Sequence, residues 1–176
     1  EEIDSIDNAY SLSLEYGKYD FGITNKIISS SIPTKYIKNY LKNTSFETDE
    51  TNFLVDGEML TKSFSSDIAY SGKRSLKVES QHAGQSLTQL ISVKKGEYYT
   101  FSGYFKNSDP FVISLSYIDE NGSKVFSEQT VETSDKFARN DVTIYYSDTA
   151  TSDLKISIEF ISTNLTYIDD IQLEEG

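Results

Sequence analysis

The chain has 176 residues, with 28 acidic and 16 basic side chains, a net charge of −12 and a pI of about 4.5. This acidic balance argues against binding to nucleic-acid phosphates or to anionic lipid surfaces, both of which need clustered Lys and Arg. The absence of Cys excludes a disulfide framework, a thiol nucleophile and a Cys-ligated metal site, and no stretch approaches the ~18 apolar residues of a membrane span.

Residues 1–40 lack the regular pattern of the rest of the chain. The chain starts at Glu1 without a signal peptide, as a segment cut from a longer protein would. EEIDSIDNAYSLSLEYGKYDFGI favours one or two strands, and residues 34–43 favour either a short helix or an extended linker. We predict an N-terminal extension or linker over residues 1–40, belonging in part to a preceding module, and one domain over residues 41–176.

From about residue 53 the sequence consists of short apolar or alternating runs separated by turn residues, which is typical of an all-β protein. Thirteen Tyr and ten Phe, with no Trp, fit this class. The pattern predicts nine strands, at residues 58–64, 74–80, 86–93, 97–107, 111–119, 123–131, 141–147, 154–162 and 165–173. Asn121-Gly122 lies between two of them and predicts a hairpin with a type I′ turn, because both residues tolerate positive φ. Strands at this spacing indicate a β-sandwich.

Four motifs occur in an order and at a spacing that point to a family. They are NTSFE at 43–47, SGKRSLKV at 71–78, KKGEYYTFSGYFK at 94–106 and YIDDIQLEEG at 167–176. The series resembles the galactose-binding-like jelly rolls, in particular the carbohydrate-binding modules attached to bacterial xylanases and cellulases. It is also similar to modules in phage tail proteins and in YD-repeat surface proteins of Gram-positive bacteria. The resemblance covers residues 41–176 and implies a galactose-binding-domain-like jelly roll.

The last motif places Asp169 and Asp170 inside an apolar strand, where two carboxylates cost free energy unless something neutralises one of them. The resemblance implies a structural calcium ion where the first and last strands meet. Its ligands would be Glu47, Asp169 or Asp170, and backbone carbonyls near Lys73. Calcium takes six to eight oxygen ligands and would neutralise the acids. Of the two aspartates, Asp169 is favoured; the alternative is that one faces solvent and the other caps a turn.

Strand alternation separates a core-facing set from a polar outer set with scattered tyrosines. The predicted core set is Tyr99, Phe101, Phe105, Val142, Ile144, Tyr146, Leu154, Ile156, Ile158 and Phe160. A polar face with tyrosines suits sugar recognition, because an aromatic ring stacks on the C–H face of a pyranose while polar groups bond its hydroxyls. The candidate sugar-binding residues are Tyr104, Tyr145, Lys106, Glu159 and Gln89, with Phe53, Tyr70 and Phe137 as loop aromatics. Tyrosines on a solvated sheet also pack across strands without binding anything, and the absence of Trp argues against long crystalline or linear glycans.

The sequence holds no recognisable catalytic constellation. The only His, His82, lies in a polar loop, and one His cannot make a zinc site. The acidic pairs fall in predicted loops or at the terminus, and neither a GxGxxG motif nor a P-loop is present. We therefore predict no enzymatic activity.

We predict a non-catalytic carbohydrate-binding module of a larger extracellular, cell-surface or virion tail protein, with a glycan and the parent's other domains as partners. The alternative is a structural spacer or protein-interaction module of a tail fibre or YD-repeat protein, without sugar binding.

Overall fold

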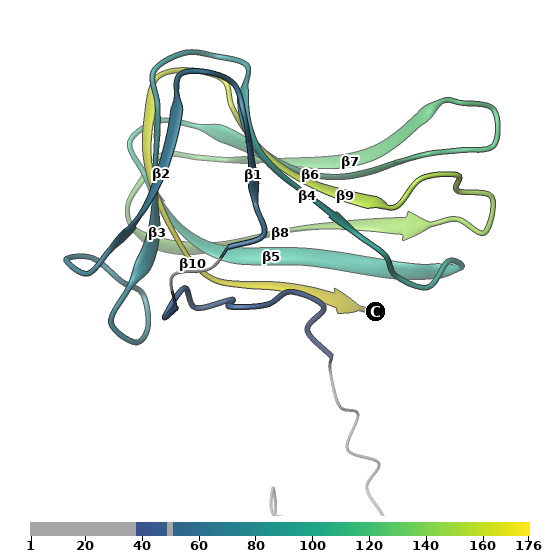
Figure 1. Cartoon of the computed structure of the whole chain (residues 1–176), viewed down its shortest axis with the longest axis horizontal. Coiled ribbons are helices and arrows are strands. Elements are labelled where there is room, and N and C mark those ends of the chain that lie inside the picture. The colour runs from purple at the N-terminus through teal and green to yellow at the C-terminus, as the bar shows by residue number, and fades with distance from the viewer. Residues whose placement is uncertain (1–37, 49–50) are drawn as a thin grey trace, which may run out of the picture. The chain divides into compact units, whose positions relative to one another are not determined.

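The computed structural model of the chain describes residues 38–48 and 51–176 (Figure 1). The predicted extension therefore lies outside the described residues, apart from residues 38–40. The described part contains ten strands, which are β1 (Leu54–Asp56), β2 (Leu60–Ser65), β3 (Ser75–Ser80), β4 (Gln85–Ile91), β5 (Glu97–Asn107), β6 (Phe111–Ile118), β7 (Lys124–Val131), β8 (Ser134–Tyr146), β9 (Leu154–Phe160) and β10 (Asn164–Glu175). No helix capable of crossing a membrane occurs in these two ranges.

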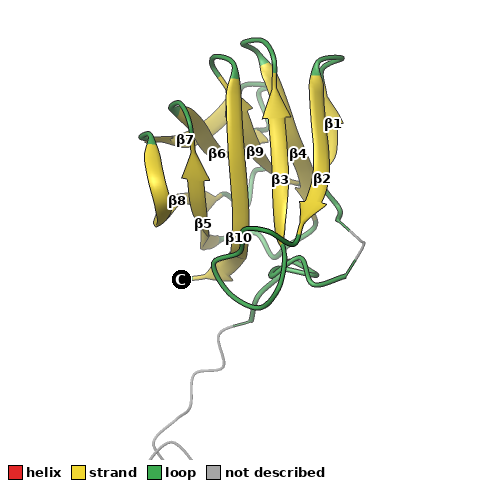
Figure 2. Ribbon diagram, turned by 90° about the vertical axis from the view of Figure 1, so that its left-hand side faces the viewer, coloured by secondary structure: helices red, strands yellow, loops and turns green. Residues whose placement is uncertain are grey.

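The strands form two five-stranded antiparallel sheets that face one another (Figure 2). Sheet A has the order β1-β4-β9-β6-β7, and sheet B has the order β2-β3-β10-β5-β8. Neighbouring strands come from distant parts of the sequence; for example, β10 lies between β3 and β5. The prediction of an all-β sandwich of the jelly-roll type is confirmed.

The core between the sheets follows the predicted alternation. Every residue of the predicted core set is buried, and burial of each large apolar side chain stabilises the fold by about 1.5–3 kcal/mol. Aromatic rings link the two sheets, since Phe105 of β5 packs edge-on against Phe111 of β6 at 5.3 Å between ring centroids. The faces of both sheets that point away from this core are therefore the surfaces available for binding.

The predicted strands match the observed ones closely, with two exceptions. The three-residue β1 was not predicted, because a run of three residues carries no detectable period. The strand expected at 141–147 begins earlier, at Ser134, because β8 pairs with β5 from Asn107 to Glu97 across a register shift.

The hairpin between β6 and β7 is confirmed, but its turn type was predicted wrongly. Gly122 has φ of 77°, whereas Asn121 is not among the described residues with positive φ. The turn is held instead by Asp119, whose Oδ1 accepts hydrogen bonds from the backbone N–H groups of Asn121 (2.9 Å) and Ser123 (2.8 Å). The side chain of Asp119, two residues before Asn121, therefore stabilises this turn.

Residues 38–44 run beside the C-terminal half of β10, in the place that β3 occupies beside its N-terminal half. The N–H of Tyr40 donates to the carbonyl of Leu173 (2.9 Å), and the N–H of Ile171 donates to the carbonyl of Thr44 (2.9 Å). The side chain of Asn39 bonds the carbonyl of Ile171 and the N–H of Leu173. These contacts join residues 39 and 40 to the sandwich, slightly before the boundary predicted at residue 41.

Candidate functional site

A β-bulge in β10 solves the problem of two adjacent aspartates in an apolar strand. The pairing of β10 with β5 shifts register between Asp169 and Gln172, and Asp170 takes a left-handed conformation with φ of 43°. The bulge buries Asp169 completely and leaves Asp170 half-buried. Ile171 and Leu173 then point back into the core.

Backbone N–H groups surround the buried carboxylate of Asp169. Its Oδ2 accepts hydrogen bonds from the N–H of Tyr70 (2.8 Å) and of Ser71 (3.1 Å), and its Oδ1 accepts one from the N–H of Asp170 (2.8 Å). Burial raises the pKa of this carboxyl, and the three N–H donors oppose that rise. The hydroxyl of Ser71 donates to Asp170 Oδ1 (2.9 Å).

The turn at residues 70–74, whose first residues bond Asp169, is bonded by Glu47 at its last two residues. Its Oε1 accepts hydrogen bonds from the N–H groups of Lys73 (2.8 Å) and Arg74 (3.0 Å), and these lower the pKa of Glu47. Gly72 has φ of 61°, and a Cβ placed there would overlap Glu47 Oε1. The turn at residues 70–74 thus brings together all four predicted metal-site residues, Glu47, Lys73, Asp169 and Asp170.

The first candidate sugar surface is the outer face of sheet A. It is defined by the outward residues of β4, β9, β6 and β7 together with the edge strand β1. Cross-strand partners place Leu90 beside Lys155, Lys155 beside Ser116, and Ser116 beside Phe126. A parallel row runs through Leu54, Thr88, Ser157, Ser114 and Glu128.

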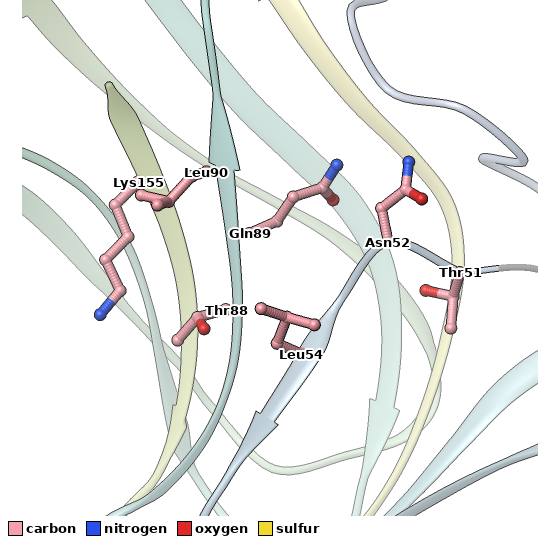
Figure 3. A pocket seen from close by; sticks show the side chains of 7 residues that line it. All are labelled: Thr51, Asn52, Leu54, Thr88, Gln89, Leu90 and Lys155. Atoms are coloured by element: carbon pink, nitrogen blue, oxygen red, sulfur yellow. The ribbon is translucent and has the colours of Figure 1, made fainter. Parts of the chain in front are cut away.

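A cavity of about 550 Å³ lies at one side of this face (Figure 3). It is lined by Thr51, Asn52, Leu54, Thr88, Gln89, Leu90 and Lys155. Leu54 and Leu90 are 69% and 64% exposed, so an apolar floor stands open to solvent beside amide, hydroxyl and ammonium groups. Gln89 points toward Asn52, away from Lys155 (Figure 3).

The opposite side of the outer face of sheet A ends in an aromatic ring. Phe126 of β7 is 54% exposed, and the ammonium group of Lys124 lies 5.3 Å from the centre of its ring. Three strand spacings separate Leu90 from Phe126, which is about 14 Å. The face therefore offers apolar surface at both sides with hydroxyl and charged groups between them, an arrangement that can bind the C–H faces and hydroxyls of a sugar chain.

The second candidate surface is the outer face of sheet B, where three of the predicted aromatics meet. The ring of Tyr70 stacks on that of Tyr104 at 3.7 Å between centroids, and Phe137 lies 5.9 Å from Tyr70. Tyr145 lies farther along the same face and packs against Tyr98 at 5.1 Å.

The other predicted sugar residues are dispersed. Lys106 is half-buried near Tyr167, its partner in β10. Glu159 lies on the outer face of sheet A beside Ser86 and Val112. Phe53 was predicted wrongly as a loop platform, because it is 1% exposed and belongs to the core.

Sequence reasoning missed Leu54, Thr88, Leu90, Phe126 and Lys155 on the outer face of sheet A. The alternation in β7 could have singled out Phe126, since Val125 on its other side is half-buried against the core. Alternation also places Lys155 on the outside of its strand, between the core residues Leu154 and Ile156. It could not show that Lys155 lies near Leu54, Thr88 and Leu90, because only strand pairing brings β1, β4 and β9 together.

Comparisons with known proteins bear on the family and the fold of this chain. The family model described as a carbohydrate binding domain matches residues 38–164. The chain belongs to this family. No curated protein sequence matches this chain.

Solved structures similar to this carbohydrate-binding domain share its fold at low sequence identity. The CBM22-1 xylan-binding domain from Paenibacillus barcinonensis is 21% identical with a TM-score of 0.63, over 75% of this chain and 91% of that one. TmCBM61, solved in complex with β-1,4-galactotriose, is 24% identical with a TM-score of 0.55, over 79% of this chain and 99% of that one. The enzymatically active domain of tailspike protein 4 from bacteriophage CBA120 is 14% identical with a TM-score of 0.61, over 78% of this chain but 21% of that one.

The resemblance implies a calcium ion, which needs oxygen ligands around the turn at residues 70–74. The turn at residues 70–74 bonds three carboxylates at different points, those of Glu47, Asp169 and Asp170, and carboxylate oxygen is the ligand type that a hard cation prefers. However, Glu47 Oε1 and Asp169 Oδ2 each accept two N–H groups already. Within residues 38–48 and 51–176, no three Asp, Glu or His side chains converge closely enough to hold an ion. A calcium ion here would therefore draw on the other carboxylate oxygens and on backbone carbonyls.

Proposed function

We propose that this domain binds a glycan without transforming it, and that the outer face of sheet A is the binding surface. The observation that carries the proposal is the open cavity of about 550 Å³, in which exposed leucines lie beside Thr88, Gln89 and Lys155. A sugar chain crossing the strands would stack on Phe126 at one side and fill this cavity at the other. The solved relatives named above as binding xylan and β-1,4-galactotriose support these glycans as the first ones to test.

The biological role that we propose is targeting. A weak module raises the local concentration of its parent protein on a glycan surface, and several modules together gain avidity. We expect the parent to act outside the cell or on a virion tail, with the catalytic work, if any, performed by other domains.

The test is affinity electrophoresis of the full chain in gels that contain soluble xylan or β-1,4-galactan. The wild-type protein is expected to be retarded by one of them, and Phe126→Ala combined with Lys155→Ala is expected to abolish the retardation. Phe126→Tyr keeps an aromatic ring and should preserve binding. Retardation that is unchanged in the double variant would show that the outer face of sheet A is not the binding surface, and release of reducing sugar ends would show that the domain is catalytic.

A second candidate function is a structural spacer within a tail protein, without sugar affinity. It is worth testing because this chain shares its fold with 21% of a tailspike domain. Two results together would support it: no retardation by any glycan, and a stable association with neighbouring domains of the parent.

We also propose a structural calcium ion at the turn of residues 70–74. Calcium that binds only the folded state must raise the free energy of unfolding, by about 2.7 kcal/mol at a hundredfold excess over its dissociation constant. The melting temperature rises accordingly. Melting in EDTA and then in calcium tests this directly. The shift should disappear in Glu47→Ala and in Asp169→Ala, and a wild-type protein that melts identically in both buffers would refute the proposal.

A further inference from the structure

The outer face of sheet B carries a pair of exposed aromatic rings that the cavity on sheet A does not use. Tyr98 of β5 and Tyr145 of β8 are direct cross-strand partners and are 58% and 42% exposed. Their ring centroids lie 5.1 Å apart with an angle of 53° between the planes. The next pair on this face is Thr100 and Thr143, whose hydroxyl oxygens lie 2.8 Å apart. This end of the face therefore combines open aromatic surface with hydroxyl groups.

A second group of aromatic rings lies at the other end of the face. Tyr70, which is 46% exposed, stacks on Tyr104 and contacts Phe137. A cavity of about 460 Å³ opens beside them, lined by Thr44, Tyr70, Tyr104, Arg139, Asp170 and Gln172. Its polar groups include an amide, a hydroxyl, a guanidinium and a carboxylate, all of which bond sugar hydroxyls.

The spacing between the two ends suits an extended chain molecule. Tyr98 and Tyr104 point outward from the same strand, six residues apart, which corresponds to about 20 Å. The surface between them is polar, formed by Thr100, Thr143, Asp141 and Gln172 from three adjacent strands, whereas Ser102 between them is buried. A ligand that follows β5 would thus meet aromatic rings at both ends and hydrogen-bonding groups along its length.

We propose that this face is a second glycan-binding site, separate from the outer face of sheet A. The ligand class is a neutral polysaccharide. Along β5 the acidic groups Asp141, Asp170 and Glu174 exceed the two basic groups, Arg139 and Lys106, by one charge and would disfavour a uronic acid chain. The inference rests on the proposed function because it takes the same class of ligand, a glycan. The surface on sheet B is argued independently of sheet A. The two faces lie on opposite sides of the sandwich (Figure 2), so one protein would bridge two glycan chains and bind a polysaccharide with avidity.

A residue-resolved NMR titration of the full chain with xylohexaose and with β-1,4-galactotriose tests the proposal. Signals on both faces are expected to shift. Tyr98→Ala combined with Tyr145→Ala should remove the shifts along residues 98–104 and 143–145 and leave those along residues 88–90 and 155–157. Affinity for the matching polysaccharide should fall about tenfold or more as avidity is lost. Tyr98→Phe combined with Tyr145→Phe keeps both rings and should retain the shifts.

The outcomes separate the two sites. Shifts confined to the outer face of sheet A would overturn the second site and leave the proposed function intact. Shifts confined to the outer face of sheet B would support the second site and overturn the assignment to sheet A. A wild-type protein whose signals shift on neither face with either sugar would overturn both.

Discussion

The buried carboxylate of Asp169 stabilises the fold, although burial of a charged group without partners would destabilise it. A buried carboxylate without partners would destabilise the fold by several kcal/mol. Here three backbone N–H groups donate hydrogen bonds to the carboxylate, and two of them come from the turn at residues 70–71. Hydrogen bonds to a charged acceptor are worth about 1.5–3 kcal/mol each, so the carboxylate fastens that turn onto β10.

We expect Asp169→Asn to lower the free energy of unfolding by about 2–3 kcal/mol, because the amide keeps one acceptor but turns an N–H group toward other N–H donors. Urea denaturation in EDTA measures the change without a contribution from calcium. Asp170→Asn is the matched control; it is half-buried and accepts one hydroxyl, so its effect should stay below about 1 kcal/mol. Equal effects of the two variants would contradict this account.

At the scale of elements, the segment before the first strand acts as a short continuation of sheet B. It pairs with β10 beyond the point where β3 ends. Asn39 is central, because its side chain mimics a strand partner by bonding the carbonyl of Ile171 (3.1 Å) and the N–H of Leu173 (3.0 Å). The edge of β10 would otherwise be left with unpaired backbone groups.

Asn39→Ala is expected to destabilise the domain by about 1–3 kcal/mol, because it leaves part-buried backbone groups of β10 without partners. The same substitution at Asn140, which makes one long contact of 3.4 Å to the carbonyl of Ala138, should cost much less. Urea denaturation of both variants measures the difference. Equal stability of the Asn39 variant and the wild-type protein would show that this segment is not needed for the fold.

At the scale of the whole molecule, buried tyrosines make the stability depend on alkaline pH. Burial raises the pKa of Tyr99 and of Tyr146, and their hydroxyls donate to the carbonyls of Lys94 and Ser152. An unfolded Tyr loses its proton near pH 10. Above that pH the folded state retains protons that the unfolded state has released, so its stability falls as the pH rises.

We therefore expect the free energy of unfolding to be unaffected by these tyrosines below about pH 10 and to fall between about pH 10 and 11. Denaturant unfolding across this range measures it. Tyr99→Phe removes one titrating group and should make the fall less steep, although it loses the hydrogen bond to Lys94. A free energy of unfolding that stays constant up to about pH 11 would contradict the expectation.

The amino-acid sequence predicts the fold class, most of the strands and the residues of the core. These follow from local alternation, which any chain with this pattern must obey to bury its apolar side chains. The sequence also singled out Asp169, because an acid inside an apolar run demands a partner. It identified Tyr70, Tyr104 and Phe137 as aromatic but could not show that they meet.

Which residues share a surface depends on the order in which the strands pair. Leu90 and Phe126 lie 36 positions apart in the sequence, yet strand pairing through β9 and β6 places them on one face. The same folding buries Phe53 in the core, although the local pattern left it as a loop residue. The period of a strand assigns each side chain to one side of that strand. Its neighbours on the surface are set by the strand order, which no local pattern contains.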